Sequence, residues 1–248
     1  MQDLKISLIT VVYNAENTIS DCITSVLGQL YSNVEYIVID GGSTDKTLNI
    51  IHSYKNRISH FISEPDRGIY DAMNKGIELA TGDVIGILNA DDFFADNMVL
   101  VSIADAFNKN RTDIVYGDLE YLNEKGDVLR KWRSSSFRRR NFEYGWMPAH
   151  PTFYCRRELF GRFGVYSLRF GTAADYELML RFLYAGKLTA VYLDKVLVKM
   201  RTGGKSNQSL TSRLKGLFHD FRAMRHNRIF LPIFTIIMKP MRKIRQYI

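Results

Sequence analysis

The feature that most constrains this fold is a regular alternation of short aliphatic runs with segments of helical periodicity. Runs rich in Ile, Val and Leu predict strands at residues 6–12, 34–40, 58–63 and 84–88. Between them, apolar residues recur every three or four positions, which predicts helices over residues 15–30, 44–54 and 69–80. Strands that are apolar along their whole length are typical of parallel sheets covered by helices on both faces. The first half of the chain is therefore expected to be α/β.

The pattern changes after a further helix expected at residues 97–108. Residues 114–123 and 128–132 flank the turn-forming run Glu124-Lys125-Gly126-Asp127, which predicts a β-hairpin. Another helix is expected at residues 175–185. The predicted fold is thus a mixed, mostly parallel sheet with helices on both faces, followed by a helical C-terminal tail.

The charge of the chain is concentrated at its C-terminal end. The net charge is +8, but residues 195–248 hold 13 Lys or Arg and one acid, Asp220, which gives this segment +12 and leaves −4 for residues 1–194. A basic tail on a weakly acidic body argues against a nucleic-acid-binding protein and favours attachment to an anionic surface.

Polar residues gather where the predicted parallel strands end, which is where such sheets bind ligands. The most informative of these loops follows the strand at residues 84–88 and holds Asn89, Asp91 and Asp92 within four positions. Several oxygen ligands at a rigid strand end suit a hard cation such as Mn²⁺ or Mg²⁺ that also contacts phosphates. Asp, Asn and Gly are also common turn formers, so a single loop of this kind has a purely structural alternative.

Five short motifs in a fixed order resemble bacterial family-2 glycosyltransferases of the GT-A fold. They are Val12-Tyr13-Asn14, Ile39-Asp40-Gly41-Gly42-Ser43-Thr44-Asp45, Asp71-Ala72-Met73-Asn74-Lys75-Gly76, Leu88-Asn89-Ala90-Asp91-Asp92 and Ala174-Asp175-Tyr176-Glu177-Leu178. The resemblance extends from about residue 6 to residue 200. It implies a nucleotide-sugar donor, a divalent cation and inversion at the anomeric carbon.

The resemblance also assigns roles to residues of the donor site. Val11, Tyr13 and Asn14 would border the nucleoside, Asp40 would accept a hydrogen bond from the base, and Arg67 would lie near the diphosphate. Asp91 matches the last acid of the family's Asp-any-Asp motif and is the expected metal ligand, with Asp92 beside it. Asn89 stands where many relatives carry the first Asp, and its amide oxygen could bond a ribose or reach the metal through water.

The resemblance points to Asp175 as the catalytic base, although the family's usual Glu-Asp pair is Ala174-Asp175 here. A carboxylate at a helix N-terminus is favoured in its charged form and can take a proton from an acceptor hydroxyl. The alternative is a structural helix cap. His150 is a candidate for the acceptor site, and Arg138-Arg139-Arg140 is a candidate for binding a phosphorylated acceptor.

The expected division is a GT-A-like catalytic domain at residues 1–205, with a nucleotide-binding half (1–110) and an acceptor half (111–205), and a basic amphipathic helical tail (206–248). Gly203-Gly204 marks the boundary to the tail. The uncharged run at residues 229–238 would form a helix of about 15 Å, half the roughly 30 Å of a hydrocarbon core. The tail is therefore expected to lie on a membrane surface and to be dispensable for folding. The alternative is a tail packed on the catalytic domain or on a second subunit of a homodimer.

The localisation expected is cytoplasmic and peripheral, on the inner face of the plasma membrane. The first residues lack the features of a signal peptide, and Cys22 and Cys155 have no zinc or disulfide pattern, so both are expected to be reduced and packed.

The function expected is transfer of a sugar from a nucleotide-sugar, such as a UDP-sugar, to a hydroxyl of a glycan or polyprenyl-linked acceptor in surface polysaccharide synthesis. One alternative is a non-catalytic nucleotide-sugar-binding module, which would not need both Asp91 and Asp175. Another is a sugar nucleotidyltransferase, which would carry a glycine-rich basic loop where this chain has residues 12–16.

Overall fold

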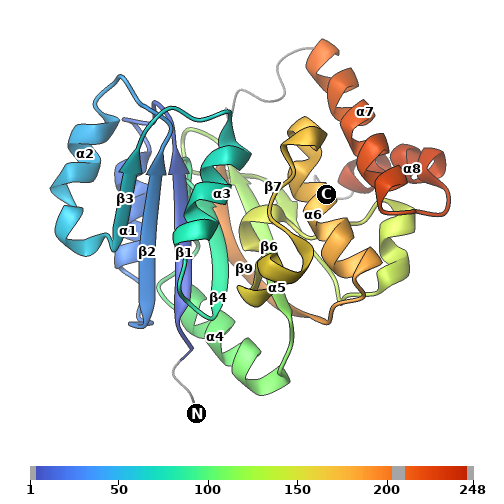
Figure 1. The fold of residues 1–248 in the computed structure, drawn as a ribbon, viewed down its shortest axis with the longest axis horizontal. Helices are drawn as coiled ribbons and strands as arrows, with labels where there is room; N and C mark the ends of the chain where they lie inside the picture. Colours follow the sequence, from blue (N-terminus) through green and yellow to red (C-terminus); the bar gives the residue numbers. More distant parts are fainter. Residues whose placement is uncertain (1–3, 203–209, 245–248) are drawn as a thin grey trace.

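The computed structural model describes residues 4–202 and 210–244, and its first half is a four-stranded parallel sheet. The strands are β1 (Ile6–Val12), β2 (Val34–Asp40), β3 (His60–Ser63) and β4 (Val84–Asn89). They lie in the order β3-β2-β1-β4 (Figure 1), and the pairing aligns Val12 with Asp40 and Val11 with Asn89. The loops that leave β1, β2 and β4 therefore start at one level of the sheet.

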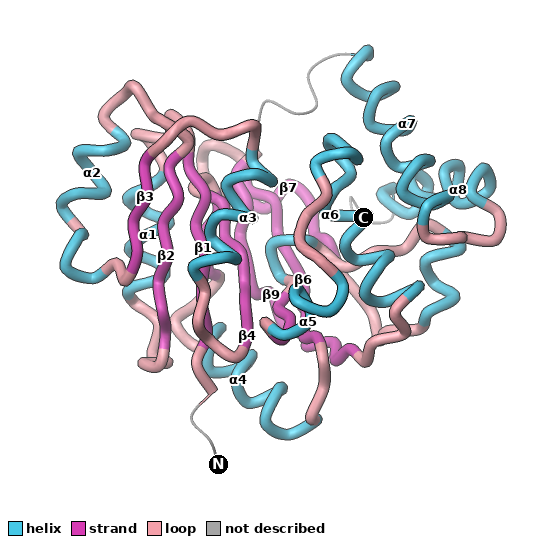
Figure 2. Tube along the Cα trace, in the orientation of Figure 1, coloured by secondary structure: helices cyan, strands magenta, loops and turns pink. Residues whose placement is uncertain are grey.

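The second half adds antiparallel and parallel strands to the open side of β4. These are β5 (Asp92–Phe94), β6 (Ile114–Leu122), β7 (Val128–Trp132), β8 (Tyr154–Arg156) and β9 (Ala190–Arg201). The sheet continues from β4 as β8-β6-β9-β5, with β7 paired to β6 as the predicted hairpin. Strand β6 is parallel to β9 but antiparallel to β7 and β8, so the sheet is mixed as predicted. Figure 2 shows the strands in magenta, with the helices around them in cyan.

Helices cover both faces of the sheet because the strand side chains alternate between two hydrophobic clusters. One face of β1 and β2 packs on α3 (Ile69–Leu79), and the other packs on α1 (Ile19–Leu27) and α4 (Val99–Asn110). Helix α3 lies in front of the sheet in Figure 1 and α1 lies behind it. The short helix α2 (Thr47–Ser53) packs beside α1. The predicted fold class is confirmed.

Residues 139–185 are built largely from short helical pieces. Three 3₁₀ segments, Arg139–Tyr144, His150–Thr152 and Leu168–Ala173, alternate with α5 (Glu158–Phe163) and α6 (Ala174–Met179). Helix α6 continues as a π-helical turn at Leu180–Ala185, so the single helix predicted here is real but changes its hydrogen bonding halfway. A further 3₁₀ turn, Lys55–Arg57, follows α2.

The tail consists of α7 (Leu210–His226) and α8 (Pro232–Ile244), which lie side by side at the end of the molecule opposite α2 (Figure 1). Ala223, Met224 and Ile229 are buried in the same hydrophobic cluster as α6. This packing agrees with the alternative in which the tail folds back on the catalytic domain. It removes the reason to expect that residues 206–248 are dispensable, because their deletion would uncover part of the core.

No helix within the described residues is long and apolar enough to cross a membrane.

Candidate functional site

The loops after β1 and β2 are tied together by their own polar groups. Asn14 has a left-handed backbone (φ 47°), its N–H donates to Ser43 Oγ at 2.8 Å, and its Oδ1 accepts from the Thr44 N–H at 2.8 Å. Left-handed φ is tolerated by Asn, which explains the residue type at this turn. The ring of Tyr13 is 59% exposed beside this turn, whereas Val11 is buried in the strand. A flat exposed ring next to a fixed loop is a suitable platform for a base.

Asp40 is fully buried, and its carboxylate holds the following loop in shape. Its Oδ2 accepts hydrogen bonds from the backbone of Gly42 and Ser43, both at 3.0 Å, and from Ser63 Oγ at 2.7 Å. Its Oδ1 accepts from the Ser43 hydroxyl. In the structure the Asp40 carboxylate therefore stabilises the loop. A hydrogen bond from a nucleotide base to Asp40 would have to be made in addition to these four bonds or replace one of them.

The sequence reasoning overlooked Asp66, whose carboxylate faces the same loop. A Cβ on Gly41 would come within 2.4 Å of Asp66 Oδ2, so glycine at position 41 makes room for this side chain. Asp66 Oδ1 accepts from the Gly68 N–H at 2.8 Å. Arg67 lies just before α3 and is largely exposed. It forms an ion pair at 2.8 Å with Asp71 in the first turn of that helix. This pairing lowers the pKa of the Asp71 carboxyl.

Only some of the side-chain polar atoms in the oxygen-rich loop after β4 have hydrogen-bond partners among the described residues. Asn89 Nδ2 donates to Asp92 Oδ2 at 3.2 Å. The Oδ1 atoms of both Asn89 and Asp92 are buried without a hydrogen-bond partner among the described residues. Burial raises the pKa of the Asp91 carboxyl, and burial together with the neighbouring Asp91 charge raises the pKa of Asp92 well above its ordinary value. Buried carboxylates that lack partners are costly unless a cation binds them.

Arg201 is a second residue that the sequence reasoning missed, because it was counted with the charge of the tail. Strand β9 brings it to this loop by pairing with β5, where Met200 lies opposite Asp92. Its charge acts on the carboxyls of both Asp91 and Asp92, and it forms an ion pair with Asp21. The guanidinium lies 4.8 Å from the centre of the Phe93 ring. The positively charged Arg201 guanidinium therefore lies beside the predicted metal-binding loop.

The side-chain oxygen atoms of this loop fit a divalent cation that takes the rest of its ligands from elsewhere. The polar atoms of Asn89, Asp91 and Asp92 that face the loop include carboxylate and amide oxygens, the ligands preferred by Mg²⁺ and Mn²⁺. Among the described residues, no group of three or more His, Cys, Asp or Glu side chains could hold a metal by itself. Phosphate oxygens and water would have to complete the coordination shell.

Asp175 lies in the first turn of α6, with its carboxylate partly exposed. Its Oδ1 accepts from the N–H of the next residue, Tyr176, at 2.7 Å, and the helix start at Ala173 has no side-chain cap. The carboxylate does not bond the N–H groups two or three positions ahead, as a capping Asp would. The geometry therefore gives no support to the helix-cap alternative.

His150 and two tyrosines surround Asp175. His150 Nε2 lies 2.7 Å from the Tyr166 hydroxyl, and the Tyr166 ring stacks on Tyr70 at 5.5 Å. Burial lowers the pKa of His150, while the Asp175 charge opposes that shift. Burial and the charge of Asp175 raise the pKa of Tyr70. Asn74 makes two 2.9 Å hydrogen bonds to the Tyr166 backbone, which holds Tyr166 beside His150.

The structure connects the two groups of predicted residues. Tyr70 follows Arg67 by three positions and donates to the Thr172 carbonyl at 3.4 Å, just before Asp175. The 3₁₀ turn that carries His150 packs against β4, the strand that ends at Asn89. Contacts therefore link the loops at the carboxyl ends of the parallel strands to the segment that carries Asp175.

Two other sequence features have structural explanations. Arg139 donates from Nε to the Tyr184 carbonyl at 2.6 Å and lies over the Tyr184 ring, so it ties the 3₁₀ segment Arg139–Tyr144 to the turn at Leu180–Ala185, while Arg138 and Arg140 are exposed. Cys22 and Cys155 are free and buried, as predicted, and burial raises the pKa of the Cys22 thiol to about 12.

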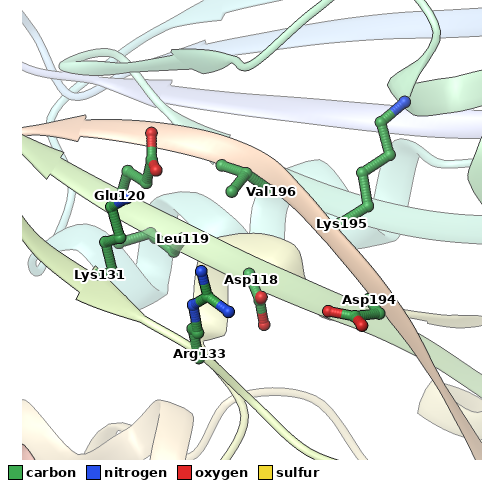
Figure 3. Close-up of a pocket in the computed structure, with 8 residues that line it drawn as sticks. All are labelled: Asp118, Leu119, Glu120, Lys131, Arg133, Asp194, Lys195 and Val196. Carbon is green, nitrogen blue, oxygen red and sulfur yellow. The ribbon is translucent and has the colours of Figure 1, made fainter. Parts of the chain in front are cut away.

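A separate hollow of about 170 Å³ lies on the β6–β9 part of the sheet (Figure 3). Asp118 lies in it and accepts from the Ser134 N–H at 2.7 Å and from the Tyr192 hydroxyl at 3.0 Å. Asp194 and Arg133 face the same space (Figure 3). Strand β9 bulges here, because the three residues between Tyr192 and Val196 lie opposite a single residue of β6, Gly117. None of the predicted site residues lines this hollow.

The mixed sheet covered by helices is similar to that of glycosyltransferases with a GT-A fold. The family model described as Glycosyl transferase family 2 matches residues 7–170. The chain belongs to glycosyl transferase family 2. A relative named PGL/p-HBAD biosynthesis glycosyltransferase, from Mycobacterium bovis, is 30% identical over 218 residues, which cover 81% of this chain and 78% of the relative.

Solved structures share the fold at low sequence identity. TarS of S. aureus superposes with a TM-score of 0.69 and 18% identity over 91% of this chain, which covers 39% of that longer chain. Its 1–349 fragment in complex with UDP gives a TM-score of 0.67 at 20% identity, covering 92% of this chain and 73% of the fragment. The mannosyltransferase PcManGT from Pyrobaculum calidifontis, in complex with GDP-Man and Mn²⁺, gives 0.68 at 16% identity, covering 96% and 72%.

Proposed function

We propose that this glycosyltransferase moves a sugar from a nucleotide-sugar, most directly a UDP-sugar, to an acceptor hydroxyl with inversion at the anomeric carbon. The observation that carries the proposal is the loop after β4. Its buried Asp92 and half-buried Asn89 each keep a buried Oδ1 atom without a partner among the described residues, beside Asp91 and Arg201. The complexes of TarS with UDP and of PcManGT with GDP-Man and Mn²⁺ support a nucleotide donor.

Asp91, with Asp92 beside it, would hold Mn²⁺ or Mg²⁺, and Asn89 would assist through water or a ribose hydroxyl. When bound, the cation supplies positive charge for a departing diphosphate. Arg201 and Arg67 add positive charge from the protein. Arg201 is held by its ion pair with Asp21, so it needs little reorganisation to act on that charge.

The nucleoside would lie against the loops after β1 and β2. Val11, Tyr13 and Asn14 form one wall, and the exposed Tyr13 ring offers a surface for the base. Asp40 remains the proposed partner of a uracil N–H. Because its oxygens already accept four hydrogen bonds, Asp66 on the adjacent loop is a second carboxylate available for that contact.

Asp175 would act as the general base. Its carboxylate accepts the proton of the acceptor hydroxyl as that oxygen bonds to C1 of the donor sugar and the bond between C1 and the diphosphate oxygen breaks. His150, whose pKa is lowered by burial, is neutral at pH 7 and bonded to Tyr166. It would position the acceptor beside Asp175.

The proposed acceptor is a glycan or polyprenyl-linked sugar in surface polysaccharide synthesis, reached on the inner face of the plasma membrane. The charge of the C-terminal segment supports a peripheral position there. A homodimer through the tail is the competing use of that segment. A binding module would not need both Asp91 and Asp175, and a sugar nucleotidyltransferase would carry a glycine-rich basic loop where this chain has residues 12–16.

The test is a screen of UDP- and GDP-sugars with this protein, with and without Mn²⁺. We expect one donor to raise the unfolding temperature by several degrees only with the cation, and to release nucleoside diphosphate slowly in water. Stabilisation by nucleotide-sugars without any release, even with candidate acceptors, would favour a binding module. No stabilisation by any nucleotide-sugar would contradict the proposal.

A further inference from the structure

Helix α8 faces the protein with Thr235, Lys239 and the partly buried Ile236, and exposes a fully apolar stripe on its outer side. Thr235 is fully buried and Lys239 is largely buried, whereas Ile233, Ile237 and Met241 are 68%, 56% and 54% exposed. These three apolar residues recur every four positions, so they form a stripe along one face of the helix. A helix on a water-soluble surface ordinarily has the opposite orientation.

Specific contacts hold Lys239 and Thr235 on the inner side of α8. The Lys239 ammonium forms an ion pair with Asp220 at 2.8 Å and lies 3.6 Å from the centre of the Tyr176 ring. The Thr235 hydroxyl donates to the Glu143 carbonyl at 2.7 Å. The backbone of α8 also packs closely on Gly145, where a Cβ would come within 2.5 Å of the Lys239 backbone nitrogen. The apolar stripe is therefore left outside by specific contacts.

Further apolar side chains are exposed on the preceding turn and on α7. Phe230 is 78% exposed and Leu231 follows it, and on α7 Leu214 and Phe218 are more than half exposed. Helices α7 and α8 are in contact and lie side by side (Figure 1). Clustered exposed side chains of this size ordinarily mark an interaction surface.

Charge indicates what covers this surface. Arg222, Arg225 and Arg228 are exposed on the same segment. Asp220, the one acid of residues 195–248, is engaged by Lys239, so it does not offset these bases. Exposed arginines around aromatic and aliphatic side chains complement an anionic membrane surface, where the bases meet phosphates and the apolar groups enter the acyl boundary.

We propose that the outer face of α8, with Phe230 and Leu231, inserts into the interfacial layer of an anionic membrane, and that Arg222, Arg225 and Arg228 bind its headgroup phosphates. Asn227, directly after α7, donates to Glu177 Oε1 at 3.3 Å, and Lys239 packs on Tyr176. Both partners directly follow Asp175. Resting on the proposed function, this docking holds the acceptor site at the bilayer and assigns it a membrane-anchored acceptor.

The test measures binding of the full chain to vesicles of phosphatidylcholine with and without 30% phosphatidylglycerol. The variant Ile233→Gln/Ile237→Gln/Met241→Gln removes the stripe, and Arg225→Gln/Arg228→Gln removes charge. The matched control, Leu30→Gln/Leu129→Gln, changes exposed leucines on other parts of the surface. We expect vesicle affinity to fall by about tenfold or more in the stripe variant and not in the control.

Salt separates insertion from simple charge attraction, because at 1 M salt the screening length is only about 3 Å. We expect partial wild-type binding to survive at 1 M salt and the stripe variant to lose it. Equal binding by the wild type and the stripe variant would overturn the proposal. So would a wild-type dimer that the stripe variant converts to a monomer without any vesicle binding, because the face would then serve a second copy.

Calorimetry with UDP and Mn²⁺ on the same preparations keeps the two proposals distinguishable. Unchanged UDP binding in the stripe variant would show that its donor site is folded. Vesicle binding in a wild-type protein that binds no nucleotide would leave the docking surface intact while removing the proposed function.

Discussion

Asp175 is the residue on which the proposed chemistry depends, and its surroundings are those of a reactive group. Its carboxylate accepts a hydrogen bond from the Tyr176 N–H and lies among Tyr70, Tyr166 and His150. Structural carboxylates in the same protein differ from it. Asp40 accepts four hydrogen bonds, and Glu177 is buried against Arg181 and Asn227.

The variant Asp175→Asn preserves shape and removes basicity. We expect turnover to fall by about 10²–10⁴-fold with nucleotide affinity almost unchanged, because general-base catalysis is typically of that size. Release of nucleoside diphosphate and UDP affinity would be measured on one preparation. Glu158→Gln, an exposed acid in the first turn of α5, is the control and should keep full turnover. Near-normal turnover of Asp175→Asn would remove it as the base.

At the scale of elements, the positions of β1, β2 and β4 depend on a buried carboxylate below the site. Glu35 of β2 accepts hydrogen bonds from Ser7 of β1, from Thr81 just before β4 and from Lys5. Burial by itself raises the pKa of Glu35, but these hydrogen bonds outweigh burial and bring the pKa to about 2. Glu35 thus joins three strands whose opposite ends carry the donor loops.

We expect Glu35→Gln to lower the free energy of unfolding at pH 7 by about 2–3 kcal/mol. Because the pKa of the folded state lies below the ordinary 4.5, the carboxylate stabilises the fold above pH 4.5 and loses this effect as the pH falls toward 2. Urea unfolding at pH 7, 4.5 and 3 would measure the difference from the wild type. The exposed Glu78→Gln should change little, and a difference for Glu35→Gln that does not shrink with acidity would contradict this account.

At the scale of the whole molecule, the tail is both part of the fold and a separate surface. Its inner side contributes Ala223, Met224 and Ile229 to the hydrophobic cluster of the acceptor half, and His219 lies against Gly171. Gly171 has a φ of 49°, and a Cβ there would come within 2.3 Å of the His219 ring, so the 3₁₀ segment before α6 is shaped to receive α7. The outer side carries the exposed apolar groups.

A pair of methionines in the tail tests this division. Met224 is fully buried and Met241 is mostly exposed. We expect Met224→Ala to destabilise the whole domain by about 2–4 kcal/mol, the usual range for a buried side chain, and Met241→Ala by less than about 0.5 kcal/mol. Thermal unfolding followed at the aromatic residues of the core would report both. If Met224→Ala melts the tail alone and leaves the main transition unchanged, the tail is an independent appendage.

The first half was predictable from the sequence because its signals are local. Strands β1 and β2 have the predicted bounds, and α3 agrees to within one residue. Strands β5, β8 and β9 were not predicted, since two of them have three residues each and β9 is recognised only through its pairing with β6 and β5. For this reason the sequence pointed to Asp91 and Asp175 but not to Arg201, whose place depends on that pairing.

The most direct test of the account is UDP binding by calorimetry, with the wild type and Asp91→Asn, in Mn²⁺ and in excess chelator. The account predicts tight binding only for the wild type with Mn²⁺, and affinity lower by about tenfold to a hundredfold in each other condition. Asp96→Asn, an exposed aspartate five residues along the chain, should bind as the wild type does. Equal UDP affinity of the wild type and Asp91→Asn, with and without chelator, would contradict the assignment of this loop as the site of cation and diphosphate.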